Sequence, residues 1–134
     1  MRFRIWALAL LAGGLLVMLM SASVNAHHSI ATFWNAEGHI EITGVLKSAR
    51  IMNPHSQIII TVTELGGTQA DWIGTSSSLQ GMRQAGYMAG DTIKPGTRVT
   101  AEGNPPRAEG AKGILISKIT TADGRVFSIR DPGQ

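Results

Sequence analysis

The sequence predicts a mostly β domain: a small OB-like barrel of five or six strands, with one short helix between the third and fourth strands and a signal peptide ahead of the domain. Three observations favour this fold class. Apolar residues alternate along short runs that glycine and proline separate. The first run contains Gly44, where a barrel strand can bend. A helical segment follows the third run, and closure of short strands into a barrel removes exposed sheet edges. Another small open barrel or a sandwich is the alternative architecture.

The leading segment, residues 1–26, is typical of a secretory signal peptide. Two arginines near its start precede an apolar run at residues 5–20, and Val-Asn-Ala at residues 24–26 places small residues at the usual cleavage offsets. The alternative is an uncleaved membrane anchor, but the apolar run is shorter than the roughly 20 residues that cross a bilayer comfortably. We therefore expect cleavage after Ala26, a single domain at residues 27–134, a periplasmic or secreted location, and no stable membrane anchor.

The charge and composition of the expected mature chain exclude several function classes. Arg2 and Arg4 carry two of the 12 basic charges, which leaves 10 basic against 9 acidic residues, a net charge of +1. So small a charge gives little support to nucleic-acid binding, which needs a basic groove and stacking aromatic side chains. The chain of 134 residues has no cysteine, so it contains no disulfide, thiolate metal site or thiol nucleophile. Its stability must come from the core.

Six runs have the alternation and the turn signals of β-strands. The first run ends in a loop at Asn53-Pro54-His55, because proline cannot donate to a sheet and keeps the preceding residue extended. Glycine pairs and Asp-Gly later in the chain are typical of hairpin turns. We predict strands at residues 39–51, 57–64, 70–75, 97–103, 114–121 and 125–129.

A capping box predicts the helix. Ser77-Ser78-Leu79-Gln80 matches the pattern S-x-x-Q ahead of a short helix that ends near Gly86. Capping is therefore the expected role of these serines, rather than nucleophilic catalysis.

The remaining aromatic residues and the longest loop also have expected places. Trp72 and Phe127 lie within predicted strands and are expected in the core, whereas Phe33 and Trp34 are expected to fold the N-terminal segment against the barrel. The Pro/Gly-rich loop at residues 104–113 carries Arg107, Glu109 and Lys112. It is interpreted as a contact surface or, alternatively, as a solvated loop.

Several segments resemble an uncharacterised family of small exported bacterial proteins, domain of unknown function 6152. These are the His-His-Ser start of the mature chain, "GVLKSARIMNPH", Trp72, "IKPGTRVTAEG" and "TTADGRVF". The resemblance covers nearly the whole mature chain, and the pairing of His-His-Ser with Asn-Pro-His is its most specific part. Met52 departs from the pattern, since an aromatic residue often precedes Asn-Pro-His, and the helix region is unusually rich in Ser and Gly. The resemblance implies export and a small β-rich domain, and it supplies no activity.

Four histidines, at positions 27, 28, 39 and 55, lie in the first part of the mature chain. Neutral imidazole is the commonest metal ligand in proteins. If cleavage frees His27, its α-amine and its ring nitrogen can chelate one ion together, and His55 from the loop would complete a three-nitrogen site that suits Cu(II). His28 is a further candidate ligand, and His39 is expected in solvent at a strand start. Binding should weaken at low pH, because an α-amine has a pKa of about 7.7–8.0.

The alternative is that none of these histidines binds a metal. His55 would then form a hydrogen bond across its turn, with Asn53 as an Asx-turn residue. His27 and His28 would form a solvated chain start.

The function predicted is that of an exported small binding protein, which binds copper through His27 and His55. A metal ion or a periplasmic protein is the expected partner, and nucleic acid is not. We do not predict an enzyme, since the sequence contains no nucleophile-elbow, zinc-protease, P-loop or dinucleotide-binding motif. The alternative is a periplasmic structural or partner-binding module without metal or catalysis, and a histidine-brace oxidase is a third class.

Overall fold

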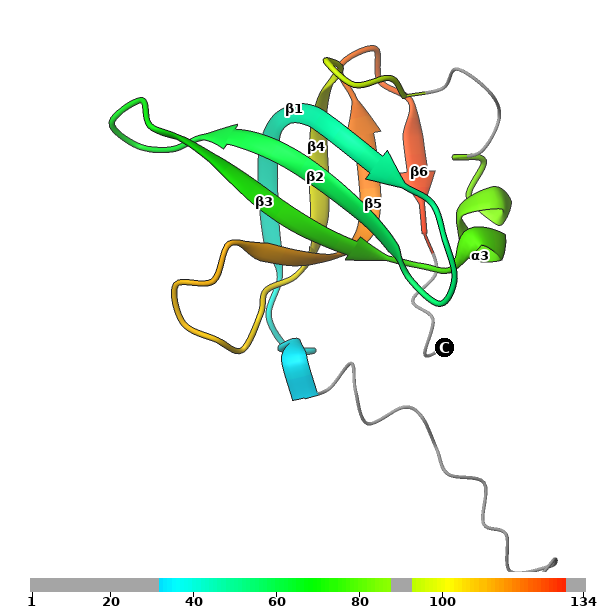
Figure 1. The fold of residues 1–134 in the computed structure, drawn as a ribbon, viewed down its shortest axis with the longest axis horizontal. Helices are drawn as coiled ribbons and strands as arrows, with labels where there is room; N and C mark the ends of the chain where they lie inside the picture. The colour runs from blue at the N-terminus through cyan, green and yellow to red at the C-terminus, as the bar shows by residue number, and fades with distance from the viewer. Residues whose placement is uncertain (1–31, 88–92, 130–134) are drawn as a thin grey trace, which may run out of the picture.

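The computed structural model describes residues 32–87 and 93–129, and the predicted signal peptide lies outside them. Each predicted strand is present with bounds that agree within one residue, and the helix follows the third strand (Figure 1). The elements are β1 (Ile40–Arg50), β2 (Ser56–Thr63), β3 (Gln69–Ser76), α3 (Leu79–Gln84), β4 (Arg98–Asn104), β5 (Gly113–Thr121) and β6 (Val126–Ser128).

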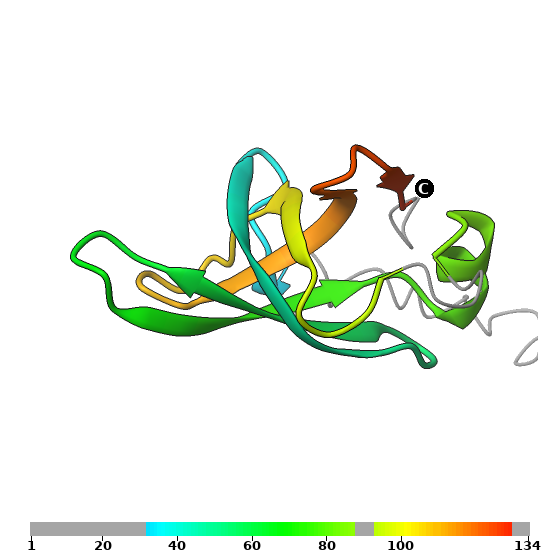
Figure 2. The same cartoon turned by 90° about the horizontal axis from the view of Figure 1, so that it is seen from above.

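Pairing between β3 and β5 closes the sheet into a barrel. The strand order is β3-β2-β1-β4-β5-β6, and β3 also pairs with β5 in parallel, with Ile73 opposite Gly113 and Thr75 opposite Leu115. Five strands thus form the closed barrel, while β6 extends the sheet beside β5 (Figures 1 and 2). The predicted OB-like barrel with a short helix after its third strand is confirmed.

The first strand bends at Gly44, as the sequence predicts. Residues 40–45 of β1 pair with β4, and residues 45–50 pair with β2. The strand therefore forms hydrogen bonds with one neighbour along its first half and with the other neighbour along its second half. A Cβ atom on Gly44 would lie 2.3 Å from the carbonyl oxygen of Thr61 in β2. Only glycine allows the two backbones to approach so closely.

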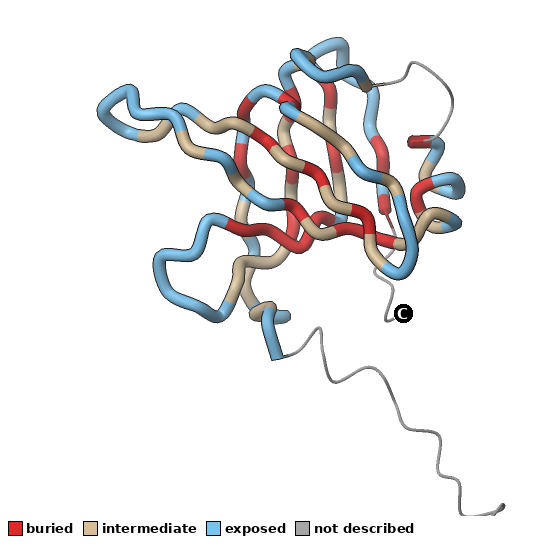
Figure 3. The backbone as a smooth tube through the Cα atoms, in the orientation of Figure 1, coloured by how far each residue is buried: buried red, intermediate tan, exposed pale blue. Residues whose placement is uncertain are grey.

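The core lies inside the barrel, and the strands alternate between buried and exposed positions (Figure 3). This alternation follows from the two-residue period of a strand, because successive side chains point to opposite faces. Phe127 is buried and Trp72 packs against the core, as predicted. The buried apolar cluster comprises Ile42, Leu46, Ile58, Ile60, Met82, Tyr87, Val99, Ala101, Ile114, Ile116, Ile119, Phe127 and Ile129.

The predicted capping box is wrong by one residue. Ser78, not Ser77, is the N-cap of α3, and its hydroxyl oxygen accepts a hydrogen bond from the amide of Gly81 at 3.4 Å. Ser77 is buried and continues the sheet instead, because its carbonyl accepts from the amide of Ser56 at 2.9 Å. Glycine therefore occupies the N3 position where the capping box would need Gln80. The helix still ends close to Gly86, as expected.

The helix α3 lies at one end of the barrel, away from the tip of the β2–β3 hairpin (Figures 1 and 2). It has six residues, and among them only Met82 is buried. Within residues 32–87 and 93–129, no helix is long and apolar enough to cross a membrane.

Tyr87, the only tyrosine in the chain, packs edge-on against Phe127 with ring centroids 5.7 Å apart. Burial raises the pKa of Tyr87 to about 12. The folded state favours the neutral phenol, so we expect folding stability to fall as the pH rises from 10 towards 12. An absorbance titration of the folded protein should show tyrosine ionising near pH 12. Ionisation of Tyr87 near pH 10 in the folded protein would contradict this raised pKa. The variant Tyr87→Phe should not show the part of the stability loss between pH 10 and 12 that comes from ionisation of the phenol.

Candidate functional site

The described residues include two of the four histidines, and they lie at opposite ends of β1. His39 precedes the strand and is exposed, as expected, with its Nε2 3.9 Å from a carboxylate oxygen of Glu102. His55 lies in the loop between β1 and β2 and is half-buried. His27 and His28 lie outside the described residues. The structure therefore does not bring His39 and His55 together.

The hydrogen bonds around His55 differ from those that the metal-free alternative predicts. Asn53 Oδ1 accepts a hydrogen bond from the amide of Leu79 at 3.1 Å, so this side chain ties the β1–β2 loop to the start of α3. His55 Nδ1 is buried and has no hydrogen-bond partner among the described residues. The Asx turn with a hydrogen-bonded histidine is therefore not the arrangement found.

His55 lines a cavity of about 510 Å³ outside the barrel core, which we call the His55 pocket. Its walls come from four segments distant in sequence: the N-terminal segment, the β1–β2 loop, the middle of β3, and the β4–β5 loop with the start of β5. Figure 1 shows the N-terminal segment and the β4–β5 loop on the same side of the barrel. The lining residues are Phe33, Trp34, His55, Ile73, Thr75, Pro106, Ala108, Ala111, Lys112, Gly113 and Leu115.

Backbone pairing fixes the N-terminal segment to the β4–β5 loop. Trp34 forms an isolated β-bridge with Pro106, and the carbonyl of Phe33 accepts from the amide of Arg107 at 2.9 Å. Nearby, the side-chain amide of Asn104 donates to three backbone carbonyls of residues 35–38. The N-terminal segment therefore lies against the barrel as expected, with the Trp34 ring over Gly113, although the Phe33 side chain is 65% exposed.

The wall of the pocket is mainly apolar. The Trp34 ring lies over Gly113, where an added Cβ would sit 3.5 Å from the ring. Phe33 is 65% exposed and Ile73 is 49% exposed, so two large apolar side chains border the opening. The ammonium of Lys112 pairs with the carboxylate of Glu64, which neutralises the charge that Lys112 brings.

A buried polar nitrogen without a partner is unusual and costly, because it has lost its water without gaining a hydrogen bond. Two other buried polar atoms lack partners in the described chain, the indole nitrogen of Trp72 and the hydroxyl of Tyr87. Neither residue lines the His55 pocket. His55 lines the pocket, but its Nδ1 has almost no accessible surface, so a ligand in the pocket contacts this nitrogen only if the imidazole ring turns. The apolar lining together with this histidine makes the pocket a candidate binding site.

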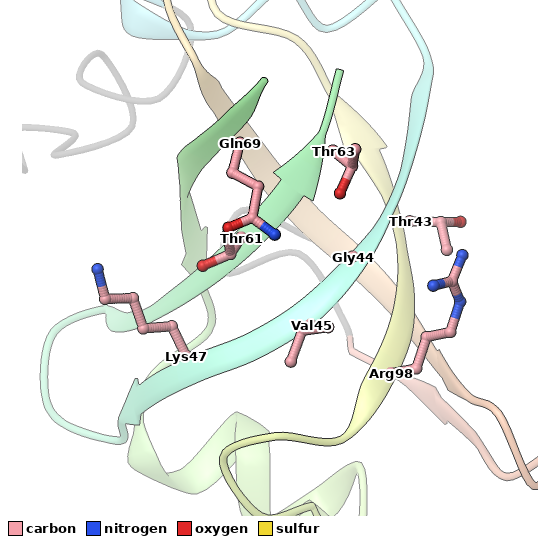
Figure 4. A pocket seen from close by; sticks show the side chains of 8 residues that line it. All are labelled: Thr43, Gly44, Val45, Lys47, Thr61, Thr63, Gln69 and Arg98. Carbon is pink, nitrogen blue, oxygen red and sulfur yellow. The ribbon is translucent and has the colours of Figure 1, made fainter. Parts of the chain in front are cut away.

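A second concave surface, the polar groove, crosses the outer face of β3, β2, β1 and β4 beside Gly44 (Figure 4). Its volume is about 440 Å³. At its edge the Lys47 ammonium contacts Asp71 at 2.5 Å, and Thr61 donates to the same carboxylate at 2.8 Å. These two hydrogen bonds, that of Lys47 foremost, lower the pKa of Asp71. Thr43, Gly44, Val45, Lys47, Thr61, Thr63, Gln69 and Arg98 line the groove.

Sequence reasoning missed most of the residues that line the His55 pocket. In the β4–β5 loop it singled out Arg107, Glu109 and Lys112, of which only Lys112 lines the cavity. The small residues Ala108 and Ala111 line it instead. Small residues leave space in a loop, but their pattern in a sequence does not indicate where that space lies.

The described residues place no second histidine or carboxylate cluster with His55 that could complete a metal site. Among residues 32–87 and 93–129 no group of three or more His, Asp or Glu side chains is placed to hold a metal. His55 can therefore supply one ligand, and the predicted His27 and His28 remain the candidates for the others.

A family model matches residues 15–116 of the chain. The chain belongs to the Family of unknown function (DUF6152). The match to DUF6152 includes the His-His-Ser segment and every residue that lines the His55 pocket, and it ends within β5. A comparison with curated proteins finds no significant match.

Proposed function

We propose that this DUF6152 protein is an exported small binding protein, that its binding site is the His55 pocket, and that it binds Cu(II) there through His27 and His55. The observation that carries the proposal is His55 itself, which lines the pocket and whose unpartnered Nδ1 becomes available to an ion once the imidazole ring turns. Imidazole nitrogen is a preferred ligand of Cu(II), and without cysteine the donors available to this chain are nitrogen, oxygen and methionine sulfur.

The course of the chain supports His27 as the partner of His55. Phe33 lines the pocket, so the polypeptide enters the described structure beside it. If cleavage follows Ala26, five residues separate the amine of His27 from Thr32, and a fully extended chain of that length spans about 17 Å. The free amine and ring of His27 therefore have enough chain to reach the pocket, and His28 is the alternative ligand.

A metal-free partner-binding module is the second candidate function. The observation that favours it is the apolar opening of the pocket, which Phe33 and Ile73 border with large exposed side chains. Exposed apolar surface around a concave site is typical of surfaces that bind a partner or a ligand.

Copper titration of the exported protein distinguishes the two candidates. The chain is expressed with its leader, its mature mass is measured to establish His27 as the first residue, and Cu(II) is titrated calorimetrically. We expect one Cu(II) ion per chain. Three serines inserted ahead of His27 should weaken binding by at least about 100-fold, which corresponds to ~2.7 kcal/mol, because they separate the amine from the ring. A single inserted residue is avoided, because it would place His28 third in the chain, where the amine, two backbone amides and that imidazole bind Cu(II) by themselves.

Two histidine variants locate the other ligand. His55→Ala should weaken Cu(II) binding by a similar factor, whereas His39→Ala should leave it unchanged, because His39 lies at the opposite end of β1. Unaltered affinity after the serine insertion would reject the amine chelate, and unaltered affinity in His55→Ala would reject His55 as a ligand. If Cu(II) does not bind to the mature protein at all, the metal-free module is the better description.

A further inference from the structure

We infer that the His55 pocket binds a neutral aromatic alcohol of about two rings, such as a naphthol-sized phenol. The inference rests on the proposed binding site, but it does not depend on copper. Three properties of the pocket define this ligand class: its size and apolar wall, its lack of net charge, and the unsatisfied nitrogen of His55.

The size and wall of the pocket favour flat apolar molecules. A volume of about 510 Å³ lies within the range of small-molecule sites. It also exceeds the roughly 150 Å³ that accommodates a single benzene ring. The rings of Phe33 and Trp34 line the cavity together with Pro106, and aromatic ligands stack well on such surfaces. Ala108 and Ala111 leave the space that larger side chains would fill.

The charges around the pocket favour a neutral ligand. Lys112 is the only lining residue that carries a formal charge, histidine aside, and Glu64 neutralises it in an ion pair. A carboxylate ligand would have to compete with Glu64 for this ammonium. A cationic ligand would find no acidic side chain among the lining residues. The apolar wall thus offers no unpaired, oppositely charged side chain to an anionic or a cationic ligand.

The buried nitrogen of His55 favours a hydroxyl group on the ligand. Nδ1 of neutral imidazole is either a donor or an acceptor, depending on the tautomer. Nδ1 has almost no accessible surface in this structure, so the imidazole ring must turn to present it to the pocket. A hydroxyl both donates and accepts, so it can then satisfy Nδ1 in either state. Thr75, on strand β3, adds the hydroxyl group of its own side chain to the pocket lining. One hydroxyl on an otherwise apolar ligand thus matches the polar content of the pocket.

The test uses 2-naphthol as the probe and the mature full-length protein in buffer with a chelator. We expect a Kd on the order of 100 µM by calorimetry, as is typical of a ligand of this size. Naphthalene, which lacks the hydroxyl, should bind several-fold more weakly, and 2-naphthoate should bind more weakly still. Amide shift mapping should place the probe at Trp34, Ala111 and Gly113 rather than at Thr43 and Arg98 of the polar groove.

Two matched substitutions of alanine by leucine test the location of the ligand. Ala111→Leu fills the pocket from an exposed loop position and should reduce 2-naphthol affinity by at least tenfold. Ala122→Leu, in the exposed β5–β6 turn, should have no effect. In His55→Leu the preference for 2-naphthol over naphthalene should disappear, because the leucine retains an apolar wall but has no nitrogen.

Failure of this inference is distinct from failure of the copper proposal. The serine insertion ahead of His27 should weaken Cu(II) binding and leave 2-naphthol affinity unchanged, since the aromatic ligand uses no group of the N-terminal residue. Absence of 2-naphthol binding, or equal binding of 2-naphthol to Ala111→Leu, would overturn the inference while leaving the Cu(II) result to stand on its own. A dimer seen by sedimentation and dissociated by Ala111→Leu would assign the pocket to a second copy of the chain and would also overturn it.

Discussion

Replacing Gly44 by alanine is expected to lower the free energy of unfolding by about 2–4 kcal/mol, because the new methyl group has no room. It would lie 2.3 Å from the carbonyl oxygen of Thr61 and 2.8 Å from Cγ2 of Ile60. The nearest atom belongs to the backbone of β2, so a side-chain rotation cannot relieve the contact. The strands must separate next to the Val45–Thr61 pair, where β1 passes from one partner strand to the other. Urea unfolding at fixed pH measures the loss.

Gly113→Ala is the matched control for this substitution. An added Cβ at Gly113, also in a strand, would lie 3.5 Å from the nearest atom, which is an ordinary van der Waals distance. We expect this variant to differ from the wild type by no more than about 1 kcal/mol. If the two variants lose equal stability, the close approach at Gly44 is not the reason for the glycine.

Met82→Ala is expected to cost about 2–5 kcal/mol, which is the usual range when a buried methionine is truncated. A helix of six residues is too short to persist in water without tertiary contacts. Met82 is completely buried and is the only buried residue of α3. Its sulfur also accepts a weak hydrogen bond from the hydroxyl of Ser76, at 3.5 Å. This one side chain therefore provides most of the attachment between α3 and the barrel.

Two further variants of α3 separate packing from helix propensity. Met82→Leu keeps the volume and should cost less than about 1.5 kcal/mol. Arg83→Ala, at an exposed position of the same helix, should stay within about 0.5 kcal/mol of the wild type. Thermal unfolding and hydrogen exchange of the α3 amides measure both effects. If Met82→Ala leaves global stability unchanged while the α3 amides exchange faster, the helix opens on its own and does not support the barrel.

Local patterns allowed the strands to be predicted from the sequence. Alternation with a period of two determines which residues face the core, and Gly44 indicated the bend correctly because a close backbone approach excludes any side chain. The N-cap was harder to predict, since three consecutive serines can each act as a cap. Burial of Ser77 against β2 decides between them, and burial depends on tertiary structure.

The candidate site was only partly predictable. His55 could be recognised because its residue type and its place after Asn-Pro are local features of the sequence. The pocket could not be recognised, since it forms where strands far apart in the chain meet. The parallel pairing of β3 with β5 brings Ile73 beside Gly113, and no periodicity within either strand encodes that register.

The parallel pairing of β3 with β5, which closes the barrel, also determines at which stage of folding the His55 pocket can form. Ile73, Thr75, Gly113 and Leu115 form this seam and line the pocket as well. Contacts between segments so distant in the chain form late, because a long loop must be ordered before they can be made. Only a fully closed barrel therefore offers the candidate site. A ligand that binds the proposed site would stabilise only molecules in which β3 and β5 have paired.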